Sequence, residues 1–293
     1  MGTDLRLAPR LAVGVIGVGR AGAPMAAALK RAGHPVVGAH AVSGRSLRRV
    51  QELLPGTPVM SVEEVMRAAD LVLLTVPDDV LGDLVSGLAD TDSVTPGQFL
   101  MHASGRYGTA ILEPATRLGA LPLALHPVMT FTGTAADLDR LSGCPFGVTA
   151  PPVLRPVAEA LVVEMGGDPV WVPESARPLY HAALANGANH LVTLVAQTLD
   201  LLAAAGVERP PELIRPLLTA ALDNVLRMGD EALTGPVARG DAGTVAAHLE
   251  ALSRAAPEAR SAYVAMARLT ADRALAAGLL DPEAAEALLD VLR

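Results

Sequence analysis

An apolar stretch that leads directly into a glycine-rich turn constrains this chain more than any other feature. Residues 11–16 predict a buried strand, and residues 17–22 read Gly-Val-Gly-Arg-Ala-Gly, which has the G-x-G-x-x-G spacing. A helical pattern covers 23–31, Gly33-His34-Pro35 ends it, and a second apolar run covers 36–42. A strand, glycine turn, helix and strand in this order predict a βαβ unit that binds a dinucleotide.

Each glycine of the turn has a physical role in such a site. Gly17 permits a tight exit from the strand, Gly19 lets a pyrophosphate approach the backbone, and Gly22 lets the helix pack against the sheet. The start of the helix presents free N–H groups and the positive end of its dipole to the phosphates. The predicted cofactor contacts in the turn are Gly17, Gly19, Arg20, Ala21 and Gly22.

The end of the second predicted strand distinguishes between the two nicotinamide dinucleotides. Enzymes that use NAD place an Asp or Glu there to bind the ribose 2′-hydroxyl, and such a carboxylate would repel a 2′-phosphate. This chain has Ser43, Arg45 and Ser46 there instead. Because hydroxyl and guanidinium groups donate to phosphate oxygens, we expect NADP(H), with Arg45 as the main phosphate partner. The alternative is a loop with solvated arginines.

The pattern of elements divides the chain in two. The first half alternates apolar strands, expected at 12–17, 36–42, 71–76, 99–102, 121–125, 146–149 and 170–172, with helical stretches, which predicts a doubly wound α/β domain. Val76 and Pro77 end the third strand where the nicotinamide half of a cofactor would lie. From residue 173 onward every segment reads as helical, starting with one long helix that ends near residue 205. We therefore predict a Rossmann domain over 1–174 and an all-α domain over 175–293.

Composition argues against several classes of protein. The net charge is −8 and no basic tract appears, so a nucleic-acid partner is not expected. The single Cys144 excludes an internal disulfide, and the seven histidines lack metal-ligand spacing, so no metal is expected. The apolar stretch at 191–206 is short and carries Gln197 and Asp200, which favours a buried helix over a membrane span. A cytoplasmic protein is the expectation.

Several motifs along nearly the whole chain carry a family resemblance. They are the glycine turn at 17–22, Leu-Leu-Thr-Val-Pro-Asp-Asp at 73–79, His-Ala-Ser-Gly at 102–105, Leu-His-Pro-Val-Met-Thr-Phe at 125–131, Tyr-His-Ala-Ala at 180–183 with Asn189, and 233–241. With them the chain resembles bacterial Rossmann-like proteins that have a C-terminal helical domain of unknown function. These belong to the 6-phosphogluconate-dehydrogenase-like superfamily, with ketopantoate, pyrroline-carboxylate and prephenate oxidoreductases. The resemblance implies an NADP-dependent oxidoreductase that forms a homodimer.

The chain departs from these relatives at the position of a catalytic lysine. The resemblance implies a lysine on the long helix, but Lys30 is the only lysine, and the helix carries His181 and Asn189 instead. Histidine suits proton donation to a developing oxyanion, because its ordinary pKa is about 6.5. We therefore predict that His181 or His126 supplies the proton and that Asn189 orients the substrate. The alternatives are a histidine packed between helices for His181 and a buried structural histidine for His126.

The substrate is expected to be a small anion. His102, Ser104 and the Gly105 amide follow a predicted strand at the edge of the sheet where ligands bind, so they are predicted to contact its carboxylate. Arg239 would supply local positive charge in an acidic protein, unless its loop is purely structural. The leading prediction is an NADPH-dependent reductase of a small 2-oxo acid, with ketopantoate as the first substrate to test. The alternatives are an imine reductase, a prephenate-type dehydrogenase, or a non-catalytic NADP-binding protein.

Overall fold

The chain forms two compact units, described here separately. A computed structural model describes residues 10–293. The N-terminal unit ends at Ala185, and the C-terminal unit covers Asn186–Arg293. The division falls inside the long helix α8 (Arg177–Ala204), whereas the sequence pattern placed a domain boundary just before this helix, at residue 174. The first residues of α8 therefore pack as part of the N-terminal unit.

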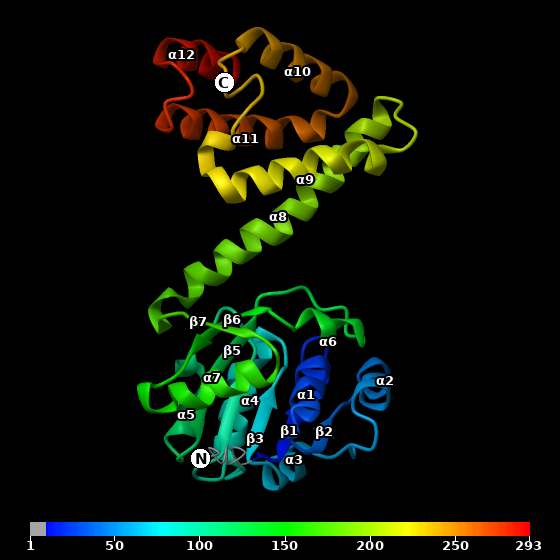
Figure 1. Ribbon diagram of the computed structural model, residues 1–293, viewed down its shortest axis with the longest axis vertical. Helices are drawn as coiled ribbons and strands as arrows, with labels where there is room; N and C mark the ends of the chain where they lie inside the picture. The colour runs from blue at the N-terminus through cyan, green and yellow to red at the C-terminus, as the bar shows by residue number, and fades with distance from the viewer. Residues whose placement is uncertain (1–9) are drawn as a thin grey trace, which may run out of the picture. The chain divides into compact units, whose positions relative to one another are not determined.

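The N-terminal unit is built on a seven-stranded sheet (Figure 1). The strand order is β2-β1-β3-β4-β5-β6-β7. The bounds are Val13–Ile16 for β1, Val36–His40 for β2, Leu71–Leu74 for β3, Phe99–His102 for β4, Leu121–Pro127 for β5, Pro145–Thr149 for β6 and Asp168–Trp171 for β7. Every neighbouring pair is parallel except β5 and β6, which are antiparallel. The predicted doubly wound architecture is confirmed, with one reversed strand pair that the hydrophobic pattern does not reveal.

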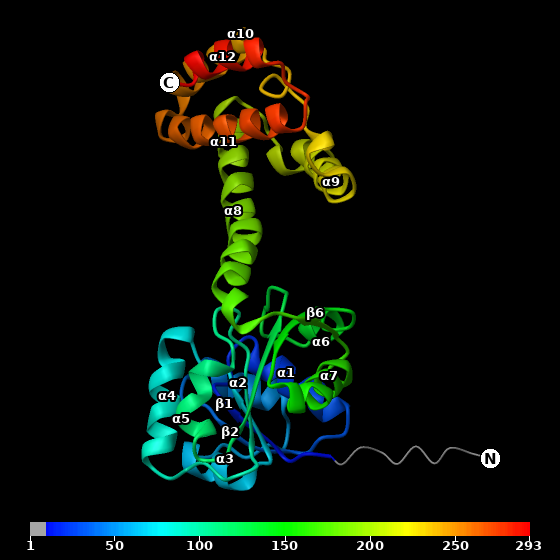
Figure 2. The same cartoon turned by 90° about the vertical axis from the view of Figure 1, so that its left-hand side faces the viewer.

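Helices cover both faces of this sheet, which agrees with the apolar character of its inner strands β1 and β3. Figure 2 shows α4 and α5 on one side and α1, α6 and α7 on the other. Two separate apolar clusters fill the two layers. The helices are α1 (Gly22–Arg31), α2 (Gly44–Leu53), α3 (Val62–Ala68), α4 (Asp78–Asp90), α5 (Glu113–Thr116), α6 (Ala136–Arg140) and α7 (Arg155–Glu164), with 3-10 turns η1 (Thr109–Leu112), η2 (Pro152–Leu154) and η3 (Glu174–Ala176).

The strand register aligns the carboxyl ends of four strands. Ile16 of β1 lies beside Leu74 of β3, Leu74 beside His102 of β4, and His102 beside Ala124 of β5. The loops that follow these strands therefore gather along one edge of the sheet. In open parallel sheets this is the edge at which ligands bind.

The C-terminal unit is helical, as predicted. It contains the remainder of α8, then α9 (Pro210–Met228), η4 (Gly229–Ala232), α10 (Ala242–Ala255), α11 (Pro257–Ala276) and α12 (Pro282–Val291). Its apolar core is formed by α10, α11, α12 and the residues that flank them. Asp241 caps α10 by accepting from the Thr244 N–H at 3.0 Å, in agreement with the sequence. Within residues 10–293, no helix has the length and apolar character needed to cross a membrane.

Candidate functional site

The glycine turn after β1 has the geometry of a phosphate-binding turn. Gly17 has a φ of +94°, and a Cβ atom there would lie 2.8 Å from the carbonyl of Thr75. The Thr75 hydroxyl donates to the Gly17 carbonyl at 2.6 Å and occupies the space where a Gly22 side chain would be. Gly19 has only the Thr75 oxygen near, at 3.8 Å from an added Cβ atom. Gly17 and Gly22 therefore let the turn pack closely against Thr75 at the end of β3, while Gly19 leaves the backbone open to a ligand.

A groove of about 390 Å³ lies along this turn. It is lined by residues 16–19, 40–43, Ser46, Arg49, Val62, 75–77, Val80 and Leu84. The adjacent helix α1 follows its N-cap residue Ala21, which makes no side-chain cap. The N–H of Gly22 at its start is available to an anion, and Arg20 beside it is exposed. An open Gly19, an uncapped helix start and a groove that includes Val76 and Pro77 fit the pyrophosphate and adjoining sugars of a dinucleotide.

The end of the groove at β2 is rich in donors and has no carboxylate in its lining. The Ser46 hydroxyl donates to the Ser43 carbonyl at 2.8 Å, and the Ser43 hydroxyl accepts from the Ser46 N–H at 3.1 Å. This capping box shapes the start of α2, and the Ser43 hydroxyl also lies 2.9 Å from the Ser46 hydroxyl, to which it can donate. Arg45 is exposed and does not line the groove, whereas Arg49 is half-buried and does.

Arg49 is a site residue that the sequence analysis did not single out. A Cβ atom on Gly133, which has a φ of +78°, would lie 2.6 Å from Nε of Arg49 and 3.0 Å from Cγ of Arg20. The Gly133 loop is held by the buried Asp137 carboxylate, which accepts backbone N–H groups from residues 132–134. Although burial opposes ionisation, these hydrogen bonds hold the pKa of Asp137 below its ordinary value. The signal for Arg49 was its spacing of three residues from Ser46, which places both on one face of α2.

Two histidines meet beside Gly105, at the carboxyl ends of β4 and β5. A Cβ atom on Gly105 would lie 2.9 Å from Nε2 of His126 and 2.8 Å from Cδ2 of His181. The two imidazole rings are nearly perpendicular, with centroids 6.3 Å apart. His126 comes from β5 and His181 from the first turns of α8, so two segments far apart in the sequence bring both predicted proton donors to one place. Gly105 is required there because any side chain would collide with both rings.

The charge state of His126 differs from the sequence-based expectation. Burial, with the neighbouring charges of Arg177, His181 and His102, lowers the pKa of His126 to about 4. The expectation that both protonation forms of this imidazole are accessible near neutral pH is therefore wrong. His126 is a neutral imidazole near pH 7, and it can donate a hydrogen bond only through whichever ring nitrogen carries the hydrogen.

The Arg177 side chain, which the sequence analysis did not recognise, holds this edge of the sheet together. Only 1% of its surface is exposed, and no carboxylate of the described residues pairs with it. Instead the guanidinium donates to the Thr149 hydroxyl at 2.8 Å and to the carbonyls of Ala124 at 2.9 Å, Gly147 at 3.0 Å and Ser104 at 3.3 Å. One side chain thereby links the start of α8 to β5, to β6 and to the loop after β4.

His102 and Ser104 have structural contacts that the sequence did not predict. His102 is fully buried, its Nε2 lies 2.8 Å from the Gly108 carbonyl, and its Nδ1 accepts the Ser104 N–H. Burial lowers the pKa of His102 to about 4. The Ser104 hydroxyl accepts the N–H groups of Arg106 and Tyr107. Direct substrate contact by His102 does not fit these facts, because both of its ring nitrogens shape the loop that carries Gly105.

Asn189 and Arg239 lie in the C-terminal unit. Asn189 is an exposed residue of α8, and Arg239 is exposed in the loop between η4 and α10. The N-terminal unit by itself brings together His126, His181, Ser104 and Gly105. The proposed roles of Asn189 and Arg239 stay predictions.

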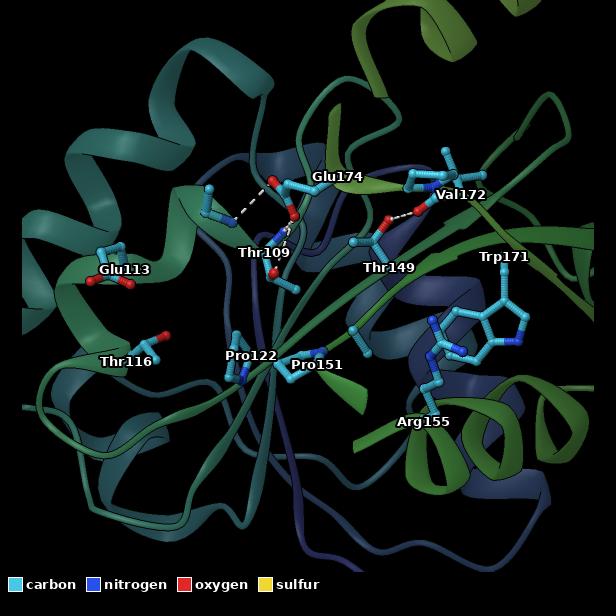
Figure 3. Close-up of a pocket in the computed structure, with 13 residues that line it drawn as sticks. Thr109, Glu113, Thr116, Pro122, Thr149, Pro151, Arg155, Trp171, Val172 and Glu174 are labelled. Carbon is cyan, nitrogen blue, oxygen red and sulfur yellow. Dashed lines mark hydrogen bonds between the residues drawn. The ribbon is translucent and has the colours of Figure 1, made fainter. Parts of the chain in front are cut away.

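A second cavity, of about 520 Å³, lies in the N-terminal unit away from the predicted residues (Figure 3). The Arg155 guanidinium lies over the Trp171 ring at 4.6 Å from its centroid. The Glu174 carboxylate accepts the N–H groups of Thr109 and Ala110, and the Thr149 hydroxyl donates to the Val172 carbonyl. The Glu174 carboxylate thus holds η1 in place, and the cavity shares none of the groove's lining residues.

Among residues 10–293, no group of three or more His, Cys, Asp or Glu side chains is placed to hold a metal.

Models of known domains match both halves of the sequence. A Rossmann-like domain matches residues 2–127, and a domain of unknown function, DUF2520, matches residues 144–270. No curated protein shows a significant match to the chain.

Solved structures with similar folds include oxidoreductases. A candidate NADP oxidoreductase from Bacteroides fragilis has a TM-score of 0.74 at 20% identity, covering 90% of this chain and 98% of its own. An imine reductase from a Pseudomonas species has a TM-score of 0.69 at 20% identity, covering 97% and 100%. A pyrroline carboxylate reductase from Plasmodium falciparum, with NADP bound, has a TM-score of 0.56 at 12% identity, covering 95% and 98%. At these identities the similarity establishes the fold. The chain therefore combines a Rossmann-like domain with the C-terminal domain of unknown function DUF2520, as the motifs in its sequence implied.

Proposed function

We propose that this protein is an NADPH-dependent reductase that acts on a C=O or C=N bond of a small substrate. The observation that carries the proposal is the position of two sites on one sheet edge. The glycine-turn groove follows β1, β2 and β3, and the pair His126 and His181 lies beside the loop after the neighbouring strand β4. A bound dinucleotide and a proton donor are the two components that reduction of such a bond requires.

The chemistry of the groove supports NADPH over NADH. The groove has no carboxylate to hold a ribose 2′-hydroxyl, and it has the Arg49 guanidinium and the Ser43 hydroxyl to hold a 2′-phosphate. When bound, NADPH supplies the hydride. In this proposal Arg49 replaces Arg45 as the main phosphate partner, because Arg49 lines the groove.

The substrate is the less constrained part of the proposal. Ketopantoate, the first expectation, gains no specific support, since the named neighbours reduce imines or pyrroline carboxylates. An imine substrate is the second candidate, and the similarity to an imine reductase along 97% of this chain favours it. We propose that Asn189 orients either substrate and that Arg239 recruits an anionic one.

We also propose that the working form is a pair of identical chains. Exposed apolar side chains of α8 and α9 include Leu191, Val192, Leu194, Leu213, Leu217, Leu222, Val225 and Leu226. The segment of α8 in the C-terminal unit carries only one acidic residue, Asp200, and no lysine or arginine. A nearly uncharged apolar surface can pair with its own copy without like-charge repulsion, which suits a two-fold symmetric contact.

The first experiment is NADPH oxidation by the purified protein with ketopantoate and with a cyclic imine, each repeated with NADH. Prephenate is tested in the oxidative direction with NADP⁺. Turnover with NADPH and one of these substrates would support the proposal and identify the bond that is reduced. Tight NADPH binding without turnover on a broad panel of carbonyls and imines would instead favour a non-catalytic NADP-binding protein.

The cofactor assignment has a matched pair of variants on one helix. We expect Arg49→Ala to weaken NADPH binding by about tenfold to a hundredfold, since a charge-assisted hydrogen bond contributes about 1.5–3 kcal/mol. NADH binding should change little, because NADH lacks the phosphate. Arg45→Ala removes an exposed arginine near the start of the same helix and is the control. A larger loss of NADPH affinity in Arg45→Ala than in Arg49→Ala would contradict this placement of the phosphate.

A further inference from the structure

The hydroxyl of Tyr180 lies 2.9 Å from Nδ1 of His126. The two rings are nearly perpendicular, at 89°, with centroids 5.7 Å apart. Tyr180 belongs to the start of α8, and its hydroxyl occupies the space over β6 where Gly147 has no side chain. A Cβ atom at position 147 would overlap this hydroxyl, so the fold provides a specific place for it.

The surroundings of the Tyr180 hydroxyl favour it as the donor of this hydrogen bond. Among residues 10–293, the Tyr180 hydroxyl has no hydrogen-bond partner other than Nδ1 of His126. A half-buried hydroxyl is stabilised when its hydrogen is donated to an acceptor, and Nδ1 of His126 is the acceptor within reach. When Nδ1 accepts, the ring hydrogen of the neutral imidazole must reside on Nε2. Nε2 faces the backbone of Gly105, at the carboxyl edge of the sheet.

A neutral imidazole alone is a weak proton donor. His126 faces the guanidinium of Arg177 and the imidazoles of His181 and His102, and with burial these keep its pKa at about 4. It therefore has no extra proton to release near pH 7. A hydroxyl hydrogen-bonded to the other nitrogen changes this, because the ring can release one proton from Nε2 while it gains another at Nδ1.

We propose that Tyr180 is a positioning residue that holds His126 as the Nε2–H tautomer and provides the proton behind it, so that the two act as one donor. This inference rests on the proposed reductase function. As hydride from NADPH adds to the substrate carbon, the electron pair of the C=O or C=N bond moves to the oxygen or nitrogen. That atom takes the Nε2 proton of His126, and Nδ1 takes the Tyr180 proton. After product release, the Nδ1 proton returns to the phenolate and water protonates Nε2, which restores the starting tautomer.

Arg177 is placed to support this transfer. Its guanidinium carbon lies 5.7 Å from the centroid of the Tyr180 ring. Burial raises the pKa of Tyr180, and the charge of Arg177 acts in the opposite direction. The phenolate formed during the transfer therefore faces a fixed positive charge, whereas His126 returns to a neutral imidazole after each turnover.

The tautomer can be measured without any substrate, by long-range ¹H–¹⁵N correlation spectra of the histidine rings in the full-length protein. His126 is assigned by the signal lost in His126→Gln. We expect a protonated Nε2 and a bare Nδ1 between pH 6 and pH 8, and a mixture of tautomers in Tyr180→Phe. A wild-type His126 with its hydrogen on Nδ1 would overturn the proposal.

The chain offers a matched control for the removed hydroxyl. Tyr263 bonds Nδ1 of His248 at 2.8 Å, with perpendicular rings 5.9 Å apart, in the C-terminal unit. Tyr263→Phe removes the same kind of hydrogen bond, and we expect it to leave the His126 signals unchanged. A Tyr263→Phe protein that shifts them as much as Tyr180→Phe does would contradict the local origin of the effect.

The pH profile gives a second readout that a purely structural role would not move. With a substrate in hand, we expect Tyr180→Phe to lower kcat/KM by about 10²- to 10⁴-fold at pH 7–8. The deficit should shrink toward pH 5, where the His126 imidazolium becomes available as the donor. A deficit that is equal at all pH values overturns the relay. Absence of turnover on every substrate would refute the reductase function, while the tautomer measurement would still decide the Tyr180–His126 pairing.

Discussion

The two units of this molecule bury their apolar residues to different degrees. In the N-terminal unit, helices cover both faces of the sheet, and the strands β1 and β3 are buried along their whole length. In the C-terminal unit, α10, α11 and α12 share a small core, but α9 has no buried residue. The N-terminal unit therefore buries its apolar residues within itself, whereas α9 in the C-terminal unit keeps its apolar side chains exposed.

The cause lies in the two kinds of element. A parallel sheet has two apolar faces, and the crossover helices of the same chain cover them. A helix such as α9 exposes Leu217 at 64% and Leu226 at 77%, and no strand or helix of its own unit buries them. Exposed surfaces of this kind are typical of interfaces. Three measurements test this difference between the two units.

Arg177→Met should give the largest effect, on the stability of the N-terminal unit. The substitution keeps an apolar stem but removes the donor to three carbonyls and one hydroxyl, and each buried acceptor left without a partner costs about 1–3 kcal/mol. We expect a loss of about 4 kcal/mol or more in the free energy of unfolding, measured by urea denaturation. Arg177→Lys keeps one charged donor, so its free energy of unfolding should lie between those of Arg177→Met and the wild type. Equal stability of Arg177→Met and the wild type would show that this edge does not depend on the guanidinium.

Leu213→Asp combined with Leu217→Asp should disrupt the proposed pairing of α9 surfaces. Burial of one leucine contributes about 1.5–3 kcal/mol, and a two-fold contact counts each substitution twice. Because these leucines are already partly covered in a single chain, we expect the substitutions to weaken the dimer by about 3 kcal/mol or more, which light scattering after size exclusion would show as a halved mass. Val153→Asp changes an exposed apolar residue of the N-terminal unit and is the control. A wild-type protein that is monomeric at micromolar concentration would refute the pairing.

The buried His102 predicts a smaller, pH-dependent effect on the N-terminal unit. Its pKa is about 4 in the folded protein and about 6.5 when unfolded, so the unfolded chain binds a proton in this range that the folded chain does not. Neutral His102 therefore causes no loss of stability above pH 6.5. As the pH falls from 6.5 toward 4, the free energy of unfolding declines by up to about 1.4 kcal/mol per pH unit. Urea midpoints at pH 5 and pH 7 should show a shallower decline in His102→Gln than in the wild type. His248→Gln changes an exposed histidine and serves as the control; an unchanged slope in His102→Gln would contradict the burial argument.

The strand β4 shows what a hydrophobic pattern can predict about the bounds of a strand. The prediction of 99–102 matches the observed Phe99–His102, because a run of three apolar residues and a histidine, bounded by turn signals, favours a strand of this length. The antiparallel pairing of β5 and β6 was not predictable in this way, since a buried strand has the same apolar pattern in either direction. The same limit applies to Arg177, because nothing in its sequence context distinguishes it from a solvated arginine, whereas the structure buries it against β5, β6 and the loop after β4.

The arginine that we propose for the phosphate shows a finer limit. Sequence position favoured Arg45, because it lies closest to the end of β2, but the helical path of α2 places Arg49 in the groove wall. Position along a chain reports distance along the backbone, whereas a ligand contacts whichever side chains share a helix face. A helical projection from Ser46 would have identified Arg49.

The order of strands and helices, the glycine turn and the donor-rich end of β2 could be predicted from the sequence, because these depend on local spacing and periodicity. The sequence also identified His126 and His181 as separate candidates. Only the tertiary structure decided that these two rings meet across Gly105, that Tyr180 bonds one of them, and that burial keeps His126 neutral. Local chemistry fixes which groups a segment carries, but their burial, charge and neighbours arise only when distant segments pack together.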